Sequence, residues 1–405
     1  MGRLSGRVPL VGVASGYCFA GNAALLGTCD AVIATASANI GMAGPAMIEG
    51  GGLGKVAPTA IGPTSEQSAN GVVDLVAADD LEAVALAKRY LSYFQGALPP
   101  PADGAAFACA DQRALRHAVP ESRKRSYEVR DVVRTLSDDD SWLELRRGFG
   151  EGIVSGLARI GGRPLGVLAN SPEHLGGAID SDGALKAARF MELCDAFNLP
   201  LLLLSDTPGF MVGVESERTA AVRKMARLFA VASSLSVPFF TLVLRRAYGL
   251  GAMGKRDKAL TNHATKTVGS HLRARLTHAL LAAMAGGMSV GPNVFHASWP
   301  SAEAGPMGLE GAVKLGFAKE LSTAASVPLV GEFARQQLYE KILAKGYERA
   351  EALSVARTLE TDDVIDPADS RDWIIHGLDA AGVTGGGEWR ARRDGTKRRP
   401  CVSPW

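Results

Sequence analysis

Several features that define other classes of protein are missing from this sequence. No apolar run approaches the roughly 20 residues needed to span a bilayer, and the opening MGRLSGRVPL lacks a signal-peptide core. Five cysteines, Cys18, Cys29, Cys109, Cys194 and Cys401, form no C-x-x-C pair. They are interpreted as reduced thiols of a cytoplasmic protein. The net charge of +2 gives no general case for nucleic-acid binding.

What the chain has is size, apolar content and glycine. Its 405 residues are enough for two domains, 47% of them are hydrophobic, and many of its 47 glycines stand between apolar runs. Strand-like and helix-like segments alternate, which predicts an α/β fold with parallel pairing. We predict a partial N-terminal domain over 1–100, a linker over 101–147 that ends in a short helix, a second domain over 148–380 and a basic tail over 381–405.

Individual elements can be predicted from local signals. A helix over about 79–95 would be capped by Asp79 or Asp80, and another would begin after Asp180 or Ser181. The Gly pair at 161–162 predicts a hairpin turn between two strands. The leucine run in LPLLLLSD predicts a buried strand with parallel neighbours.

Two similar glycine turns stand far apart in the chain. FAGNA at 19–23 and YGLGA at 248–252 each follow an apolar run that opens with Val-Pro. A strand that enters a helix through such a turn points backbone N–H groups outward, where they attract negative charge. We predict two oxyanion holes, one from the amides near Ala20 and Gly21 and one from those near Leu250 and Gly251. Close packing of strand and helix is the alternative reason for such glycines.

The two halves are unequal. About 100 residues precede the second turn, counted from 148, whereas 18 precede FAGNA. The first unit is therefore expected to lack its opening strands, and their absence would leave a sheet edge or an apolar face open. Either a partner covers that surface, or the chain is a shortened version of the two-unit protein. Residues 254–283 look like an insertion, interpreted as a basic loop with a short helix. The spacing of His263, His271 and His278 does not favour a metal site.

The longer motifs resemble a known family. GYCFAGNAALLGTCD, NIGMAGPAMIEGGGLG, LARIGGRPLGVLAN, GGAIDSDGALKAARFMELCDAFNLPLL, DTPGFMVG, LRRAYGLGAM and WPSAEAGPMGLEGAVKLGF are similar to stretches of the carboxyltransferase (β) subunits of biotin-dependent acyl-CoA carboxylases. The resemblance covers about 10–380, apart from the insertion. It implies two crotonase-like domains in tandem, the first of them incomplete.

The resemblance also implies a mechanism. The N-terminal domain would bind acyl-CoA and the C-terminal domain carboxybiotin, and a backbone hole in each would stabilise an enolate. Ala20 and Gly21 fall where the family commonly has a Gly-Gly pair, and Leu250 and Gly251 fall at the matching second pair. Free biotin's ring nitrogen can act as the base, so no protein nucleophile or metal is expected. The expected pocket-lining residues are Gly176, Gly177, Ala178, Thr207, Pro208, Gly209, Phe210, Tyr248 and Gly249.

Partners follow from the same resemblance. No AMKM-type biotinylation motif is present, so biotin would arrive on a biotin carboxyl carrier domain, loaded by a biotin carboxylase. Family active sites lie between subunits, which implies a homo-oligomer, commonly a hexamer.

Other candidate residues have simpler interpretations. His174 is interpreted as a loop histidine, Glu49 and Glu310 as structural hydrogen-bonding groups rather than general bases, and Cys18 as a small buried residue. Tyr248 would either pack beside its turn or stack on the ureido ring of biotin, and packing is favoured.

Three other functions stay open. A decarboxylase of the same fold would run the transfer backwards, a defective paralogue would explain the shortened first half, and a hydratase or thioesterase would need a carboxylate such as Glu49 over the first turn.

Overall fold

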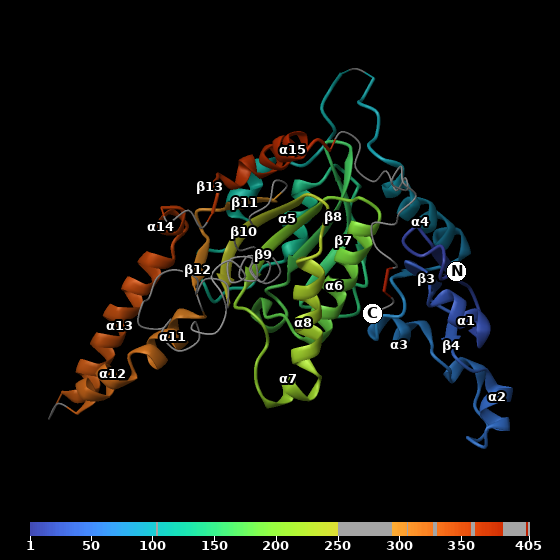
Figure 1. Ribbon diagram of the computed structural model, residues 1–405, viewed down its shortest axis with the longest axis horizontal. Helices are drawn as coiled ribbons and strands as arrows, with labels where there is room; N and C mark the ends of the chain where they lie inside the picture. Colours follow the sequence, from blue (N-terminus) through green and yellow to red (C-terminus); the bar gives the residue numbers. More distant parts are fainter. Residues whose placement is uncertain are drawn as a thin grey trace.

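The computed structural model describes residues 1–102, 104–249, 294–305, 307–326, 330–357, 361–383 and 402–403. Strands and helices alternate along the chain, and most strand pairs are parallel, so the predicted α/β class is confirmed. A small sheet from the first 77 residues lies at one side of the molecule, and a larger sheet occupies its centre (Figure 1).

The small layer is built from short parallel strands. β1 (Val11–Ala14), β3 (Ala31–Thr35) and β5 (Leu75–Ala77) form one sheet in the order β1-β3-β5, and β2 (Tyr17–Phe19) pairs with β4 (Asn39–Gly41). Its helices are α1 (Gly21–Leu26), α2 (Pro45–Gly50), α3 (Thr64–Ala69) and α4 (Asp80–Ser92). Within the described chain β1 has a strand partner on one side only, and its Val13 is exposed. The open edge expected beside this strand is therefore present.

The large sheet has the order β13-β11-β10-β9-β8-β7-β6, with β12 paired to the end of β10. Its strands are β6 (Leu143–Leu145), β7 (Ile153–Ile160), β8 (Arg163–Asn170), β9 (Leu201–Thr207), β10 (Phe239–Tyr248), β11 (Val294–Ser298), β12 (Glu303–Gly305) and β13 (Asp363–Val364). β6, β7 and β8 are antiparallel neighbours, and every later pairing is parallel. β9 is buried along its whole length, as its leucine run predicted.

Helices cover both faces of this sheet. α6 (Ser181–Ala196) and α8 (Ala221–Ala232) share one apolar cluster with Ile153, Leu157 and Leu201. α5 (Val129–Leu136) and α15 (Ser370–Ala380) share another with Val154 and Leu202. Neighbouring strand residues thus point to opposite cores, as the pleat of a strand requires.

The remaining helices lie beyond the strand ends. α7 (Val214–Arg218) precedes α8, and α11 (Leu309–Gly316), α12 (Ala318–Ala325), α13 (Gly331–Ala350) and α14 (Ala352–Ala356) follow β12. α11, α12 and α13 contact one another and form an arm that extends away from the large sheet (Figure 1).

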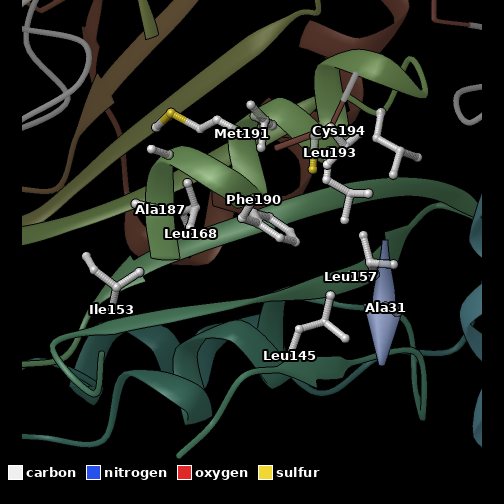
Figure 2. Packing of buried hydrophobic residues seen from close by; sticks show 14 of the residues in the cluster. Ala31, Leu145, Ile153, Leu157, Leu168, Ala187, Phe190, Met191, Leu193 and Cys194 are labelled. Carbon is white, nitrogen blue, oxygen red and sulfur yellow. The ribbon is translucent and has the colours of Figure 1, made fainter. Parts of the chain in front are cut away.

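α6 joins the two layers. Its apolar side chains Phe190 and Met191 pack over the large sheet, and Ala31 of β3 lies in the same cluster (Figure 2). Tyr90 of α4 belongs to this cluster too and is fully buried. The two parts of the chain therefore share one hydrophobic core.

Buried charges also cross between the two layers. Asp74, which precedes β5, accepts the Val32 backbone N–H at 2.8 Å and the Arg146 Nε at 2.7 Å. Arg189 of α6 donates to the carbonyl of Asp30 at 2.8 Å. These side chains are all nearly inaccessible to water. Burying their charges costs desolvation free energy, which the hydrogen bonds between them offset, and the same bonds hold the two layers together.

Local signals were accurate where they act over a few residues. Asp79 caps α4 by accepting the Glu82 N–H at 2.8 Å, and Asp180 caps α6 by accepting the Gly183 N–H at 2.7 Å. The hairpin between β7 and β8 turns at Gly161 and Gly162, both with positive φ.

The segment over 101–147, predicted as a linker, has a further structural role. Its helix α5 packs into the core of the large sheet, and its strand β6 pairs with β7. Leu115 and Tyr127 are buried in the same core. The segment packs into the core because the apolar residues of α5 recur at helical spacing. The high charge of the segment as a whole led to its prediction as a linker.

None of the helices in the described ranges combines the length and apolar composition that crossing a bilayer requires.

Candidate functional site

The two predicted turns end equivalent strands. In the first layer β2 ends at Phe19, which is paired in parallel register with Gly41 of β4. In the second, β10 ends at Tyr248, which is paired in the same way with Gly305 of β12. The neighbouring strands repeat too, because β1-β3-β5 and β10-β11-β13 have the same parallel order. The similarity of FAGNA and YGLGA therefore accompanies a repeated pattern of strand pairing.

One backbone hydrogen bond recurs at both turns. The Ala20 N–H donates to the carbonyl of Gly41 at 3.0 Å, and the Gly249 N–H donates to the carbonyl of Gly305 at 3.1 Å. This bond makes Ala20 the counterpart of Gly249, and hence Gly21 the counterpart of Leu250. Leu250 and Gly251 themselves, with the 254–283 insertion and its histidines, lie outside the described residues.

At the first turn, the amide available to bind an oxyanion is that of Gly21 and not that of Ala20. The Ala20 N–H is occupied by the bond to Gly41, so it is not free to bind an oxyanion. Gly21 is an exposed residue that opens helix α1, and its N–H has no acceptor in the parts of the chain that the structure describes. Ala20 adopts φ 57° and ψ −127°, a conformation that favours glycine.

The predicted pocket residues of the second half meet at the carboxyl ends of β9 and β10. Ile179, next to Ala178, donates its N–H to the Gly209 carbonyl at 3.0 Å, and its own carbonyl accepts from Met211 at 2.8 Å. Phe210 thus forms a β-bridge with Ile179. The loop after β9 is therefore tied to the segment that leads into α6.

Two glycines allow close backbone approach here. A Cβ at Gly177 would lie 2.3 Å from the Asp206 carbonyl oxygen, and one at Gly209 would lie 3.2 Å from that of Tyr248. Their φ angles are 86° and 109°, which L side chains rarely adopt. Gly176, Gly177, Ala178, Gly209, Phe210, Tyr248 and Gly249 are brought together in this way.

Sequence reasoning missed the charged residues beneath this cluster. Asp206 of β9 is fully buried, and its carboxylate accepts from Arg245 Nε at 3.0 Å and from Arg246 Nε at 2.6 Å. The signal was available, because charges inside apolar strands must find partners. Both DTPGF and LRRAYG carry charge that directly continues an apolar run, and the structure places these charges inside β9 and β10.

Tyr248 packs beside its turn. Its side chain is 4% exposed, and its hydroxyl donates to Glu303 Oε2 at 2.9 Å. Burial, followed by the charge of Glu303, raises the pKa of Tyr248 well above its ordinary value. Glu303 is also ion-paired with Arg123 from the 101–147 segment. The packing interpretation agrees with this burial, which leaves the ring little surface for stacking on a ligand.

His174 and Glu49 take part in surface contacts. His174 Nε2 lies 3.3 Å from Asp180 Oδ2, in the loop before α6. Glu49 is largely exposed at the end of α2, 3.4 Å from Lys55 Nζ. Neither arrangement resembles a general base enclosed in a pocket.

Glu310 and Cys18 have equally local roles. The Tyr347 hydroxyl donates to Glu310 Oε1 at 2.6 Å, and this bond lowers the pKa of the Glu310 carboxyl. Burial raises the pKa of the Cys18 thiol, which disfavours the nucleophilic thiolate. Within the described chain, His, Cys, Asp and Glu side chains form no cluster of three that could hold a metal.

Two relatives with similar sequences each align with nearly the whole chain. Over 386 residues the chain is 33% identical to the methylmalonyl-CoA carboxyltransferase 12S subunit of Propionibacterium freudenreichii subsp. shermanii, covering 93% of this chain and 65% of that protein. It is 31% identical over 381 residues to the biotin-dependent acetyl-/propionyl-coenzyme A carboxylase beta6 subunit of Mycobacterium tuberculosis, covering 93% of this chain and 72% of that one.

Solved structures give the same result. A single-chain, multi-domain long-chain acyl-CoA carboxylase superposes with a TM-score of 0.76 at 46% identity, over 93% of this chain and 33% of that chain. The transcarboxylase 12S hexamer with bound methylmalonyl-CoA superposes with a TM-score of 0.73 at 30% identity, over 94% of this chain and 66% of that chain. The chain thus spans 65% of the first relative and a third of the single-chain carboxylase. Because the family described as "Carboxyl transferase domain" matches residues 2–384, and these relatives cover nearly the same span, the chain belongs to that family.

Proposed function

We propose that this chain transfers a carboxyl group between biotin and the α-carbon of an acyl-CoA. The observation that carries the proposal is the repeated turn, in which strand pairing and one backbone hydrogen bond recur at Ala20 and Gly249. Such a repeat suits a reaction in which two carbonyl oxygens, one on each reactant, become negative in turn. Membership of the carboxyl transferase family supports the same reading.

We further propose that both layers are crotonase-like, the first of them shorter, with one oxyanion hole each. In the first, the Gly21 N–H is the donor to the thioester enolate, and Ala20 holds the turn against β4. In the second, Leu250 and Gly251 keep the role expected of them. A backbone donor of this kind contributes about 2.7–4 kcal/mol to transition-state stabilisation.

Partners and cofactor follow from the relatives. Biotin would be delivered by a carrier domain and charged by a biotin carboxylase, and the chain would act as a homo-oligomer, as the 12S relative is a hexamer. The single-chain relative indicates that such domains can also share one polypeptide. We place the protein in the cytoplasm because Cys18, Cys29, Cys109 and Cys194 are free thiols.

The test is transfer of radiolabel from carboxyl-labelled methylmalonyl-CoA to free biotin, and from labelled carboxybiotin to propionyl-CoA. Transfer in both directions supports a carboxyltransferase, while label lost as carbon dioxide without return favours the decarboxylase. Repeating the assay with a long-chain acyl-CoA, as the single-chain relative's name suggests, sets the substrate range. Absence of transfer in either direction from folded, oligomeric protein contradicts the proposal.

Proline has no N–H and is tolerated at the first position of a helix, so Gly21→Pro deletes the donor. Because proline disfavours the positive φ of the preceding Ala20, circular dichroism must first show that the variant is folded. We expect kcat to fall about 100-fold to 1,000-fold. Asp80→Pro, at the first position of α4, is the matched control and should leave kcat within about twofold.

A further inference from the structure

Asp206 and two adjacent arginines form a buried junction under the candidate biotin site. The Asp206 carboxylate is fully buried, and each of its oxygens pairs with a different arginine of β10. Arg245 is 4% exposed and Arg246 is 18% exposed in their side chains. Consecutive strand residues normally point to opposite faces, so one carboxylate should not reach both.

An irregularity in β10 explains how both arginines reach it. The register with β9 shifts between Val243 and Ala247, so the residues between them depart from regular pairing with that strand, although Arg246 pairs with Glu303 of β12. Such irregularities re-aim side chains and are common next to functional sites. Here the shift directs Arg245 and Arg246 to the same carboxylate.

The two arginines differ in what else they hold. Arg245 Nη1 donates to the carbonyl of Arg125, at 2.8 Å, in the 101–147 segment. Arg246 Nη2 donates to the carbonyl of Gly176 at 2.8 Å. One arginine therefore secures a distant connecting segment, and the other secures the predicted pocket loop.

That loop has an unusual backbone. Leu175, Gly176 and Gly177 have φ angles of 48°, 62° and 86° in succession. The Gly177 N–H donates to the His174 carbonyl at 2.8 Å, and the Ala178 N–H to the Leu175 carbonyl at 3.2 Å. Glycine adopts positive φ about as readily as negative φ, so contacts from surrounding residues must select this one arrangement of Gly176 and Gly177. The Arg246 bond is one such contact.

We propose that Arg246 is a positioning residue: anchored on Asp206, its guanidinium fixes the Gly176 carbonyl and thereby holds the Gly176–Ala178 backbone in the conformation that receives biotin. This inference rests on the function proposed above. An arginine suits the task because its planar fork can bond a carboxylate and a carbonyl together, which a lysine ammonium does with less directional control.

The test compares Arg246→Lys with Arg130→Lys, a control on α5 in which a buried arginine pairs with Glu144 at 2.6 Å, outside the Asp206 junction. For Arg246→Lys we expect KM for free biotin to rise about tenfold or more, because a charged hydrogen bond to the loop is lost. KM for methylmalonyl-CoA should stay within about twofold, because the loop is assigned to biotin alone. Arg130→Lys should leave both KM values within about twofold. An equal rise in biotin KM in both variants would show a merely structural role and overturn the proposal.

Amide hydrogen exchange supplies a readout that needs no substrate. Gly177 and Ala178 should exchange slowly in the unaltered protein and about tenfold faster in Arg246→Lys, because their hydrogen bonds depend on the anchored loop. Unchanged exchange in that variant overturns the proposal whatever the kinetics show. If Arg246→Lys does not fold, Arg246→Gln is the second variant. Fast, unprotected exchange of the Gly177 and Ala178 amides in the unaltered protein would by itself refute the proposal that Arg246 orders the loop. If the unaltered protein transfers no label, the proposed function fails, while exchange still decides whether Arg246 orders the loop.

Discussion

Lys186 allows a quantitative test of how burial affects the stability of this chain. The side chain stands on α6, is 1% exposed, and its Nζ has no hydrogen-bond partner among the described residues. Burial lowers the pKa of the ammonium from its ordinary 10.5 to about 7. Glu144 and Glu151 oppose this shift by attraction.

The magnitude and its direction with pH follow from linkage. The difference between 10.5 and about 7 corresponds to about 5 kcal/mol at about 1.36 kcal/mol per pH unit. Between those two values the unfolded chain binds more protons than the folded one, so stability rises with pH. Below about pH 7 both states carry the charge, and the whole cost of burying it remains.

Replacing Lys186 by Met removes the charge and retains an unbranched apolar side chain. We expect Lys186→Met to be more stable than the unaltered protein by about 4 kcal/mol at pH 7, falling to about 2 kcal/mol at pH 9. Urea unfolding followed by tryptophan fluorescence at several pH values measures the difference. Lys88→Met, at an exposed lysine, should show a small difference that does not vary with pH. A gain for Lys186→Met that stays constant or grows with pH would refute the reasoning.

Three further substitutions test the turns and the contact between layers. Ala20→Gly should stabilise the protein by about 1 kcal/mol in urea unfolding and keep carboxyl transfer, because its backbone conformation favours glycine; a loss of stability would contradict this. Gly177→Ala places a Cβ within 2.3 Å of a backbone oxygen, so it should displace the pocket loop and raise KM for free biotin, and unchanged kinetics would show that the loop is not part of the site. Asp74→Asn removes the carboxylate charge that pairs with the buried Arg146 guanidinium at 2.7 Å and should cost about 3–5 kcal/mol in the same unfolding assay. Asp131→Asn, at an exposed ion pair, is its control and should cost less than about 1 kcal/mol, and equal losses in the two variants would show that burial is not the cause.

Several structural elements of this protein could be predicted from short-range sequence patterns. The caps at Asp79 and Asp180, the Gly161–Gly162 hairpin and the buried β9 all depend on residues within one element or next to it. Propensity and periodicity act over the same distance, so they could be read directly. The family resemblance likewise came from contiguous motifs, and the comparisons agree with it.

Contacts between distant residues were not readable in this way. The Ala20 amide is occupied because β4 pairs with β2 in one particular register, and the charged 101–147 segment turned out to supply β6 to the large sheet. A one-residue change of register would alter either result without altering any local propensity.

The sequence by itself therefore determined the element types, the two glycine turns and the family. The tertiary structure decided which amide is free, which charges lie under the pocket loop, and that Lys186 is buried without a partner among the described residues. The physical reason is that burial and strand register arise only when the whole chain has packed, and they set both the cost of a charge and the partner of each N–H.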